Sequence, residues 1–490
     1  MALTLGDVLE KKRDAPGAPA VRPRTAVAPA SPVPLPARAR PGETAEARSA
    51  AVAIVEARWR QLIARVGLLA TGALLLNIAL QLWAQGQVTE HHEVVAMVFA
   101  LYALAAAALA AAVLPSEFAR RAAPFAPVLA IIALLVWSYV RLDISLASYG
   151  TDNAVFSHVA AEQLLDGHNP YSVNDAALID RSVERFGLPS SFVTRTTDGK
   201  PLEKLMSWPA GSIAPLVPAL ALGLDDVRWV VVAFEVATCV LLCWRAPSAL
   251  RPVVLLPLVV DPDLFLQFTG GGVMDWFWVL PMTGCAIALY GGHLGRAAVL
   301  YGLAAGTKQQ PWLLAPFLAV YVWHALAERG REERREAMLS FAGLVAAGFL
   351  LPNIAFMAWD FSGWLEAVLL PFREQLVPFG SGLSLLTQSG ISNQPKSFYS
   401  LATFGVWGVL VLAYALHFRT LRHALWLAPA VVMWFGYRGL QNYYVYWTPM
   451  LLVALMVWWE EQQAATERAI DAVDRGRGSD AALAGEGVPA

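Results

Sequence analysis

The chain has 490 residues, of which 57% are hydrophobic and only 15% are charged, and its mean hydropathy is +0.50. A soluble domain carries about 25% charged residues, so this composition indicates a polytopic membrane protein with an all-α fold. The net charge of −2 and the lack of a basic patch with interleaved aromatic residues give no reason to expect a nucleic-acid partner. Cys239, Cys243 and Cys285 lie within apolar runs, which indicates buried thiols rather than a disulfide framework.

Residues 1–60 are rich in Ala, Pro and Arg and show no apolar periodicity, so they are predicted to form a disordered tail. No apolar core follows the early basic residues closely enough for a signal peptide. Arginines crowd the start of the first apolar run, which predicts a cytoplasmic N-terminus. They are Arg48, Arg58, Arg60 and Arg65.

The apolar runs predict about 12 membrane spans within a transmembrane domain of residues 61–459. The first three spans, at 63–83, 94–114 and 123–140, place the following loop, residues 142–206, outside the cytoplasm. Residues 460–490 form a cytoplasmic tail that is predicted to be irregular beyond about Arg475. Further spans are predicted at 227–244, 252–268, 274–291, 338–357, 401–418, 424–437 and 444–459.

Two segments leave the topology open. Residues 207–224 are apolar but broken by three prolines, and residues 297–327 are interrupted by GTKQQP. If 207–224 crosses fully and 297–327 crosses once, Asp275 faces the cytoplasm. If 297–327 crosses twice and 207–224 does not cross, Asp275 and Lys308 face outside. The second arrangement places the arginines of the neighbouring connection in the cytoplasm, so it is favoured.

The outer loop opens with YGTDNAVFSHVAAEQLLDGHNPYS, residues 149–172. Short polar side chains around Asp152 predict a helix start, because they cap free backbone N–H groups. Gly167 and Pro170 predict its end. Apolar residues recur at helical spacing at Phe156, Val159, Ala160 and Leu164. The pattern predicts a short amphipathic helix along the membrane surface, with Asp152 at its start.

An acid before a short helix, followed by LL-x-G-x-N-P-Y, resembles the first extracytoplasmic loop of the GT-C class of membrane glycosyltransferases. The bacterial polyprenyl-phosphate-mannose-dependent mannosyltransferases are the most similar branch. In such enzymes the loop acid is the catalytic base, which implies this role for Asp152. Two additional N-terminal spans depart from the simplest plan of that class. The matching residues are Asp152, Leu164, Leu165, Gly167, Asn169, Pro170 and Tyr171.

The resemblance implies a GT-C-like fold in the bacterial inner membrane, with the active site on the extracytoplasmic side. It implies inverting transfer of a sugar, with mannose as one candidate, from a polyprenyl-phosphate donor to a hydroxyl of a cell-envelope glycan or glycolipid. Softer matches implicate Lys308 and Gln309 in GTKQQPWLLAP, and Arg438 and Asn442 in GYRGLQNYYVYWTP, as contacts of the donor phosphate. A guanidinium group binds phosphate oxygens in bidentate fashion. Further substrate contacts are expected at Asn169, Tyr171 and Asp275.

Each of these residues also has a structural interpretation. In this interpretation Asp152 and Asp275 mark helix starts and have no catalytic role. Arg438 is then an ordinary arginine at the membrane interface. Lys308 can extend its ammonium group to the membrane interface. The sequence shows no Gly-rich nucleotide loop or D-x-D motif, so a nucleotide-sugar donor is disfavoured. No ligand cluster predicts a metal, and no cofactor is expected.

Two other classes of function remain open. A transporter or flippase of lipid-linked intermediates would use Lys308, Glu235 and Arg438 as a polar pathway within the membrane. A structural subunit of an envelope assembly complex would need none of them as a reactive group. The acid–helix–NPY loop favours the transferase, because a transporter does not need it.

Overall fold

The computed structural model describes residues 45–84, 91–145, 149–172, 178–187, 196, 199, 206–259 and 265–485. Residues 1–51 and 52–490 form separate units. The elements discussed here belong to the second unit, except that helix α2 (Ala45–Ala84) begins in the first. The predicted disorder of residues 1–44 lies outside the described residues.

Helices make up nearly all regular structure in the described part of the chain, which confirms the all-α prediction. The strands found there are β1 (Phe379–Gly380) and β2 (Arg438–Gly439), which pair in parallel. After residue 145 the helices are α7 (Asp152–Leu165), α8 (Leu178–Phe186), η4 (Ala210–Ser212), α9 (Leu216–Ala221), α10 (Arg228–Arg245), α11 (Leu256–Val259), α12 (Phe265–Gly271), α13 (Trp276–Tyr290), α14 (Leu294–Ala305), η5 (Gln310–Leu314) and α15 (Ala315–Ala325). They continue with α16 (Arg331–Trp359), α17 (Phe361–Arg373), α18 (Leu385–Gln388), α19 (Lys396–Leu416), α20 (Phe418–Leu421), η6 (Ala424–Trp426), α21 (Ala428–Trp434), α22 (Asn442–Val445) and α23 (Thr448–Gly485).

The first three predicted spans are helices in the structure. They are α2, α4 (His92–Val113) and a continuous run of α5 (Ser116–Ala122), η1 (Ala123–Phe125), α6 (Ala126–Tyr139) and η2 (Val140–Ser145). Arg65 of α2 donates to the carbonyl oxygens of Ala112 and Leu114, both at 3.1 Å, and so fixes the corner between α4 and α5. The predicted disorder up to residue 60 is wrong for residues 45–60, because α2 begins at Ala45. The Ala, Glu and Arg residues of this stretch have high helix propensity.

Length and apolar character identify five helices in the described part of the chain that can cross a bilayer. They are Ile54–Ala84, His92–Val113, Ser116–Ile144, Arg331–Trp359 and Lys396–Leu416. Several shorter apolar helices, among them α13 and α14, join them in the bundle. These helices support a multi-pass membrane protein, but the predicted count of about 12 spans is not confirmed. The predicted span 252–268 is wrong at its start, because residues 251–255 form turns and helix α11 begins only at Leu256.

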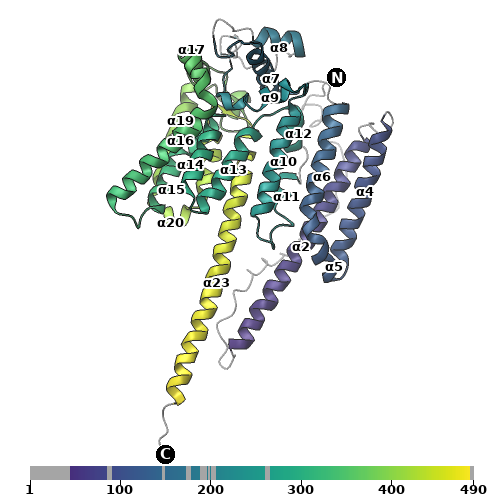
Figure 1. The fold of residues 1–490 in the computed structure, drawn as a ribbon, viewed down its shortest axis with the longest axis vertical. Coiled ribbons are helices and arrows are strands. Elements are labelled where there is room, and N and C mark those ends of the chain that lie inside the picture. Colours follow the sequence, from purple (N-terminus) through teal and green to yellow (C-terminus); the bar gives the residue numbers. More distant parts are fainter. Residues whose placement is uncertain are drawn as a thin grey trace, which may run out of the picture. The chain divides into compact units, whose positions relative to one another are not determined.

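The interrupted run 297–327 forms two helices that run in opposite directions. Helix α14 packs along α13, as Figure 1 shows, and the chain turns before it enters η5 and α15. At one end Lys308 bonds Asp275, which directly precedes α13. At the other end Tyr290 of α13 contacts Tyr321 of α15, with ring centroids 5.9 Å apart. The run therefore passes along the bundle twice, which supports the arrangement that places Asp275 and Lys308 together on the side of Asp152.

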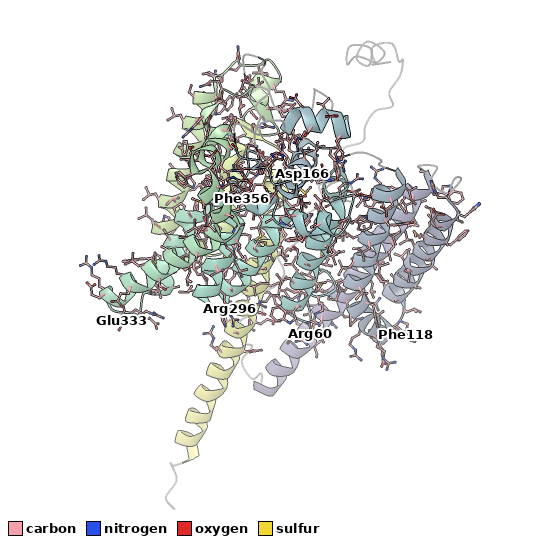
Figure 2. The ribbon with its side chains drawn as sticks, turned by 45° about the horizontal axis from the view of Figure 1, so that its top comes forward. Arg60, Phe118, Asp166, Arg296, Glu333 and Phe356 are labelled. Carbon is pink, nitrogen blue, oxygen red and sulfur yellow. The ribbon has the colours of Figure 1, made fainter. Side chains whose placement is uncertain are left out.

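Charged residues gather at the opposite end of the bundle. Arg245 at the end of α10 donates to both carboxylate oxygens of Glu460, at 2.8 and 2.7 Å, and the adjacent Glu461 pairs with Arg422. Figure 2 shows Arg296 and Glu333 toward the end that lies opposite Asp166. Helix α23 continues to Gly485, so the prediction of an irregular tail beyond Arg475 is wrong for residues 476–485. Extending a helix that is already nucleated needs only one further residue to be ordered at each step.

Candidate active site

Helix α7 spans Asp152–Leu165, as the loop sequence predicts. Its N-cap is Thr151, whose hydroxyl oxygen accepts from the N–H of Ala154 at 3.4 Å. Asp152 is the first residue of the helix itself. Gly167 follows the helix with φ +83°, a backbone conformation that favours glycine. The side chain of Thr151, not that of Asp152, therefore caps this helix.

The prediction that α7 lies on the membrane surface is wrong. Ten of its 14 residues are buried, including polar ones such as Ser157 and His158. Its apolar side packs in a cluster with Met206, Phe356 and Trp364. Small residues on its other side let neighbouring elements approach closely, so protein surrounds the helix on most sides. Figure 1 shows α7 beside α8 and α9.

Asp275, immediately before α13, is the centre of a buried polar cluster. Its Oδ1 accepts from Nζ of Lys308 at 2.6 Å and from Nε1 of Trp278 at 2.9 Å. Its Oδ2 accepts from Nδ2 of Asn442 at 2.5 Å. The Lys308 and Asp275 side chains are only 7% and 1% exposed. The structure thus brings together three predicted site residues that are up to 167 positions apart in the chain.

Asp152 lies in the electrostatic field of the same cluster. Burial raises the pKa of its carboxyl group, while the positive charges of Arg438 and Lys308 and hydrogen bonding from the backbone at Asn153 act in the opposite direction. The exposure of the whole residue is intermediate, so protein does not enclose it completely. A carboxyl group with a raised pKa beside two cations can accept a proton from a neighbouring hydroxyl group.

The two carboxylates differ in what they can do chemically. Asp275 accepts three hydrogen bonds, from Lys308, Trp278 and Asn442, so its carboxylate oxygens are already engaged. Asp152 has no such set of side-chain donors among the contacts that the structure records. Asp275 is therefore suited to hold Lys308 and Asn442 in place, and Asp152 is suited to exchange a proton.

Arg438 reaches this region on the short strand β2. The pairing of β2 with β1 depends on glycine, because a Cβ atom on Gly380 would lie 2.5 Å from the carbonyl oxygen of Gly439. The adjacent Tyr437 donates its hydroxyl to the carbonyl oxygen of Pro371 at 2.5 Å. Arg438 is half-buried and Asn442 follows it on α22, so the same segment contributes one residue near Asp152 and one bonded to Asp275.

Three predicted substrate contacts have structural partners within the protein. Nε2 of Gln309 donates to the carbonyl oxygens of Ser207 at 2.7 Å and Val368 at 3.0 Å. Tyr171 is fully buried and its hydroxyl donates to the carbonyl oxygen of Trp208 at 2.7 Å. Asn169 is also buried and accepts from the backbone N–H of Tyr171 at 3.0 Å. Their contact with a substrate stays a prediction.

Two residues near the site were missed by sequence reasoning. Trp208 places its ring under the ammonium group of Lys308, with the centroid 5.6 Å from Nζ. Asn353, in the middle of α16, accepts from the N–H of Ala210 at 2.8 Å and donates to the carbonyl oxygen of Gly306 at 2.9 Å. It therefore joins η4 to the turn before Lys308. The sequence signal that pointed to Asn353 was its position as a polar residue within an apolar, membrane-spanning run.

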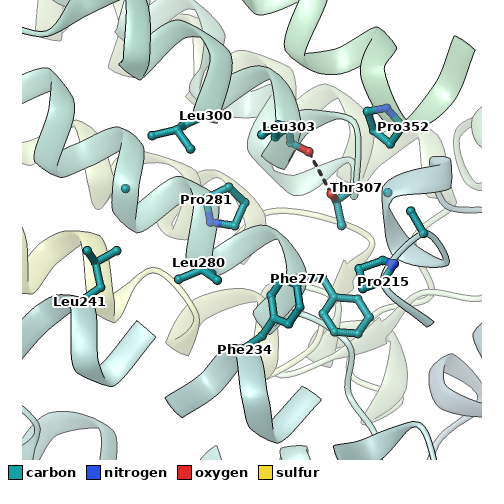
Figure 3. A pocket seen from close by; sticks show the side chains of 13 residues that line it. Pro215, Phe234, Leu241, Phe277, Leu280, Pro281, Leu300, Leu303, Thr307 and Pro352 are labelled. Atoms are coloured by element: carbon teal, nitrogen blue, oxygen red, sulfur yellow. Dashed lines mark hydrogen bonds between the residues drawn. The ribbon is translucent and has the colours of Figure 1, made fainter. Parts of the chain in front are cut away.

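An apolar cavity of about 400 Å³ begins beside this cluster (Figure 3). Thr307, the neighbour of Lys308, lies at its margin, and Phe234 and Phe277 line its wall. The cavity continues between α10, α13 and α14 toward Leu241 and Leu300. Apart from Thr307, the side chains that line it are apolar.

Within the described part of the chain, no group of three or more His, Cys, Asp or Glu side chains is arranged to hold a metal ion. Comparison with known protein families, curated proteins and solved structures returns no match for this chain.

Proposed function

We propose that this protein is an inverting membrane glycosyltransferase with a GT-C-like fold. It transfers a sugar from a polyprenyl-phosphate donor to a hydroxyl group of a cell-envelope glycan or glycolipid, on the extracytoplasmic side of the bacterial inner membrane. The observation that carries the proposal is the position of Asp152, whose carboxyl group interacts with the charges of Arg438 and Lys308, together with an apolar cavity that is lined in part by Thr307, the neighbour of Lys308. The carboxylate suits the acceptor hydroxyl group, and the two cations suit the donor phosphate. The apolar cavity suits the lipid chain of the donor.

The donor phosphate is expected to bind between Lys308 and Arg438. An ammonium group has three N–H donors, and the recorded hydrogen bond of Lys308 to Asp275 uses one of them. Arg438 adds a planar guanidinium group that suits two phosphate oxygens at once. Asp275 keeps Lys308 in place, so its charge is already oriented when the donor arrives. Preorganised cations of this kind stabilise the charge that develops on a leaving phosphate.

The cavity is suited to the part of the polyprenyl chain nearest the phosphate. Its lining residues are almost all apolar, and Phe234 and Phe277 provide aromatic walls. Burial of apolar chain surface contributes about 25 cal/mol per Å², which favours a lipid over a hydrophilic ligand there. The remainder of a long polyprenyl chain would lie in the surrounding bilayer.

In the proposed reaction the acceptor oxygen attacks the anomeric carbon of the donor. A carboxylate oxygen of Asp152 takes the hydroxyl proton as the new carbon–oxygen bond forms. The bond between the anomeric carbon and the phosphate oxygen breaks, and its electron pair leaves with the phosphate toward Lys308 and Arg438. The configuration at the anomeric carbon inverts. A positioned base contributes about 10²- to 10⁴-fold to the rate of such a step.

The arrangement of the polar residues favours the transferase over a flippase. A polar pathway for lipid headgroups would use Lys308, Glu235 and Arg438 together. Glu235 instead accepts from the hydroxyl of Thr269 at 2.6 Å, and Lys308 bonds Asp275. The two side chains thus have different partners, whereas Asp152 and Lys308 act on one another directly through their charges.

Asp152→Asn tests this proposal. We expect transfer of labelled mannose from polyprenyl-phosphate mannose, measured in membrane vesicles, to fall by at least about 10²-fold, because the amide cannot accept the proton. Asp152→Ala should be equally inactive. Neither variant should lower the melting temperature in detergent, because Thr151 supplies the cap and because the cost of burying a charged group is removed.

Asp360 provides a matched control, because it is a true N-cap and its carboxylate accepts from the N–H of Gly363 at 2.9 Å. Asp360→Ala should lower the melting temperature, because the N-cap is lost, and leave transfer intact. Asp360→Asn should change neither quantity appreciably. Wild-type turnover in Asp152→Asn would remove Asp152 from the mechanism.

A further inference from the structure

The start of α7 is hydrogen-bonded to the glycine-rich segment before Asp275. The N–H of Gly150 donates to the carbonyl oxygen of Gly271 at 3.0 Å. The hydroxyl of Thr151 donates to the carbonyl oxygen of Gly272 at 3.1 Å, and Oδ1 of Asn153 accepts from the N–H of Met274 at 2.7 Å. We call these two stretches, residues 150–154 and 270–274, the strap.

Glycine lets the two stretches approach each other so closely. Gly272 has φ +87°, and a Cβ atom added to it would lie 2.4 Å from Cβ of Ala154. A Cβ atom on Gly150 would lie 3.2 Å from Cα of Gly271. A side chain at Gly272 would therefore push the first turn of α7 away from the segment that leads to Asp275.

The strap connects the two acids of the site by a short path. Asp152 lies between Thr151 and Asn153, which both make these hydrogen bonds. Asp275 directly follows Met274, the last residue of the second stretch of the strap. Asp275 is in turn bonded to Lys308 and Asn442. Any shift of α7 relative to residues 270–274 therefore moves Asp152 relative to the cations.

We propose that the strap holds Asp152 in register with the Asp275–Lys308 pair and Arg438, and that Asn153 and Gly272 are positioning residues for Asp152. Only the catalytic role of the positioned carboxylate rests on the proposed function. The positioning itself can be measured without a sugar donor.

The experiment measures the charge coupling between position 152 and Arg438. Asp152→Cys is placed in the full-length protein with the three native cysteines replaced by Ala, and alkylation by iodoacetamide is followed against pH. A nearby cation favours the thiolate, so adding Arg438→Gln should raise the apparent pKa of the introduced thiol. We expect a shift of at least about 0.5, which is about a threefold lower thiolate fraction below the midpoint.

This shift should largely disappear in Gly272→Ala and in Asn153→Leu, because the thiol is then no longer held beside Arg438. It should return in Gly272→Ala/Ala154→Gly, because removal of the Ala154 methyl group relieves the clash. Gly292→Ala is the matched control. Gly292 also has a positive φ, of +74°, but a Cβ atom there meets nothing within 4 Å, so the shift should persist.

An undiminished shift in Asn153→Leu, or in Gly272→Ala, would overturn the proposal. So would the absence of any shift when the strap is intact. If Gly272→Ala does not fold, Asn153→Leu and the rescued double variant decide the question. Donor turnover in the same variants with Asp152 restored reports separately on the proposed function, so the two ideas can fail independently.

Discussion

Asp152 and Asp275 both lie at helix starts, but their surroundings give them different chemical properties. Asp275 is bonded to an ammonium group, an indole N–H and an amide, which hold its carboxylate in place. Asp152 is the acid whose pKa is raised by burial, while Arg438 and Lys308 limit that rise. Asp275 therefore positions its neighbours, whereas Asp152 is the carboxyl group suited to exchange a proton.

This difference predicts the pH dependence of transfer. The base must be ionised, so activity should fall as the pH drops through the pKa of Asp152, at a pH above the ordinary aspartate value of about 3.9. Arg438 favours the ionised form. Arg438→Gln should therefore raise this pKa and move the acid limb of the kcat/KM profile to higher pH.

Arg438→Lys is the control, because it keeps the charge and loses the planar guanidinium group. Its acid limb should stay near that of the wild type, while its KM for polyprenyl-phosphate mannose should rise. An acid limb that is identical in Arg438→Gln and wild type would show that Arg438 does not affect the pKa of Asp152.

At the scale of elements, local signals in the sequence predicted the boundaries of α7 and the break before η5. Thr151, Gly167 and the GTKQQP interruption act over a few residues, so they can be recognised without knowledge of the fold. The burial of α7 was not predictable in this way. Its polar face contains Ser157, His158 and Gln163, which are typical of a solvent-facing side, and the elements that cover them come from distant parts of the chain.

The site itself was predictable only as separate residues. The resemblance named Asp152, Lys308, Arg438 and Asn442, and the sequence offered Asp275 as a further site acid. Their contacts depend on how α7, α13, the 306–309 turn and β2 pack together. The close approach of Gly272 to α7 was not predicted either, because it is a property of the packed structure. Sequence spacing carries no information on such approaches between distant segments.

For the whole molecule, the charge distribution predicts orientation. The ion pairs of Arg245 with Glu460 and of Arg422 with Glu461 lie at the end opposite the site, and positive charges favour the cytoplasm. In a variant without native cysteines, Ser389→Cys, in the exposed turn after α18, should react with an impermeant thiol reagent on intact cells. Glu332→Cys, at the start of α16, should react only after permeabilisation. The reverse pattern would place Asp152 in the cytoplasm.

The central claim is that Lys308 and Arg438 hold a polyprenyl phosphate beside Asp152. A cryo-EM structure of the protein in nanodiscs with a non-transferable polyprenyl-phosphate analogue tests it most directly. We expect the phosphate to contact Lys308 and Arg438, the first isoprene units to fill the cavity lined by Phe234 and Phe277, and the anomeric position to face Asp152. A phosphate bound away from both cations, with the cavity empty of lipid chain, would contradict this account.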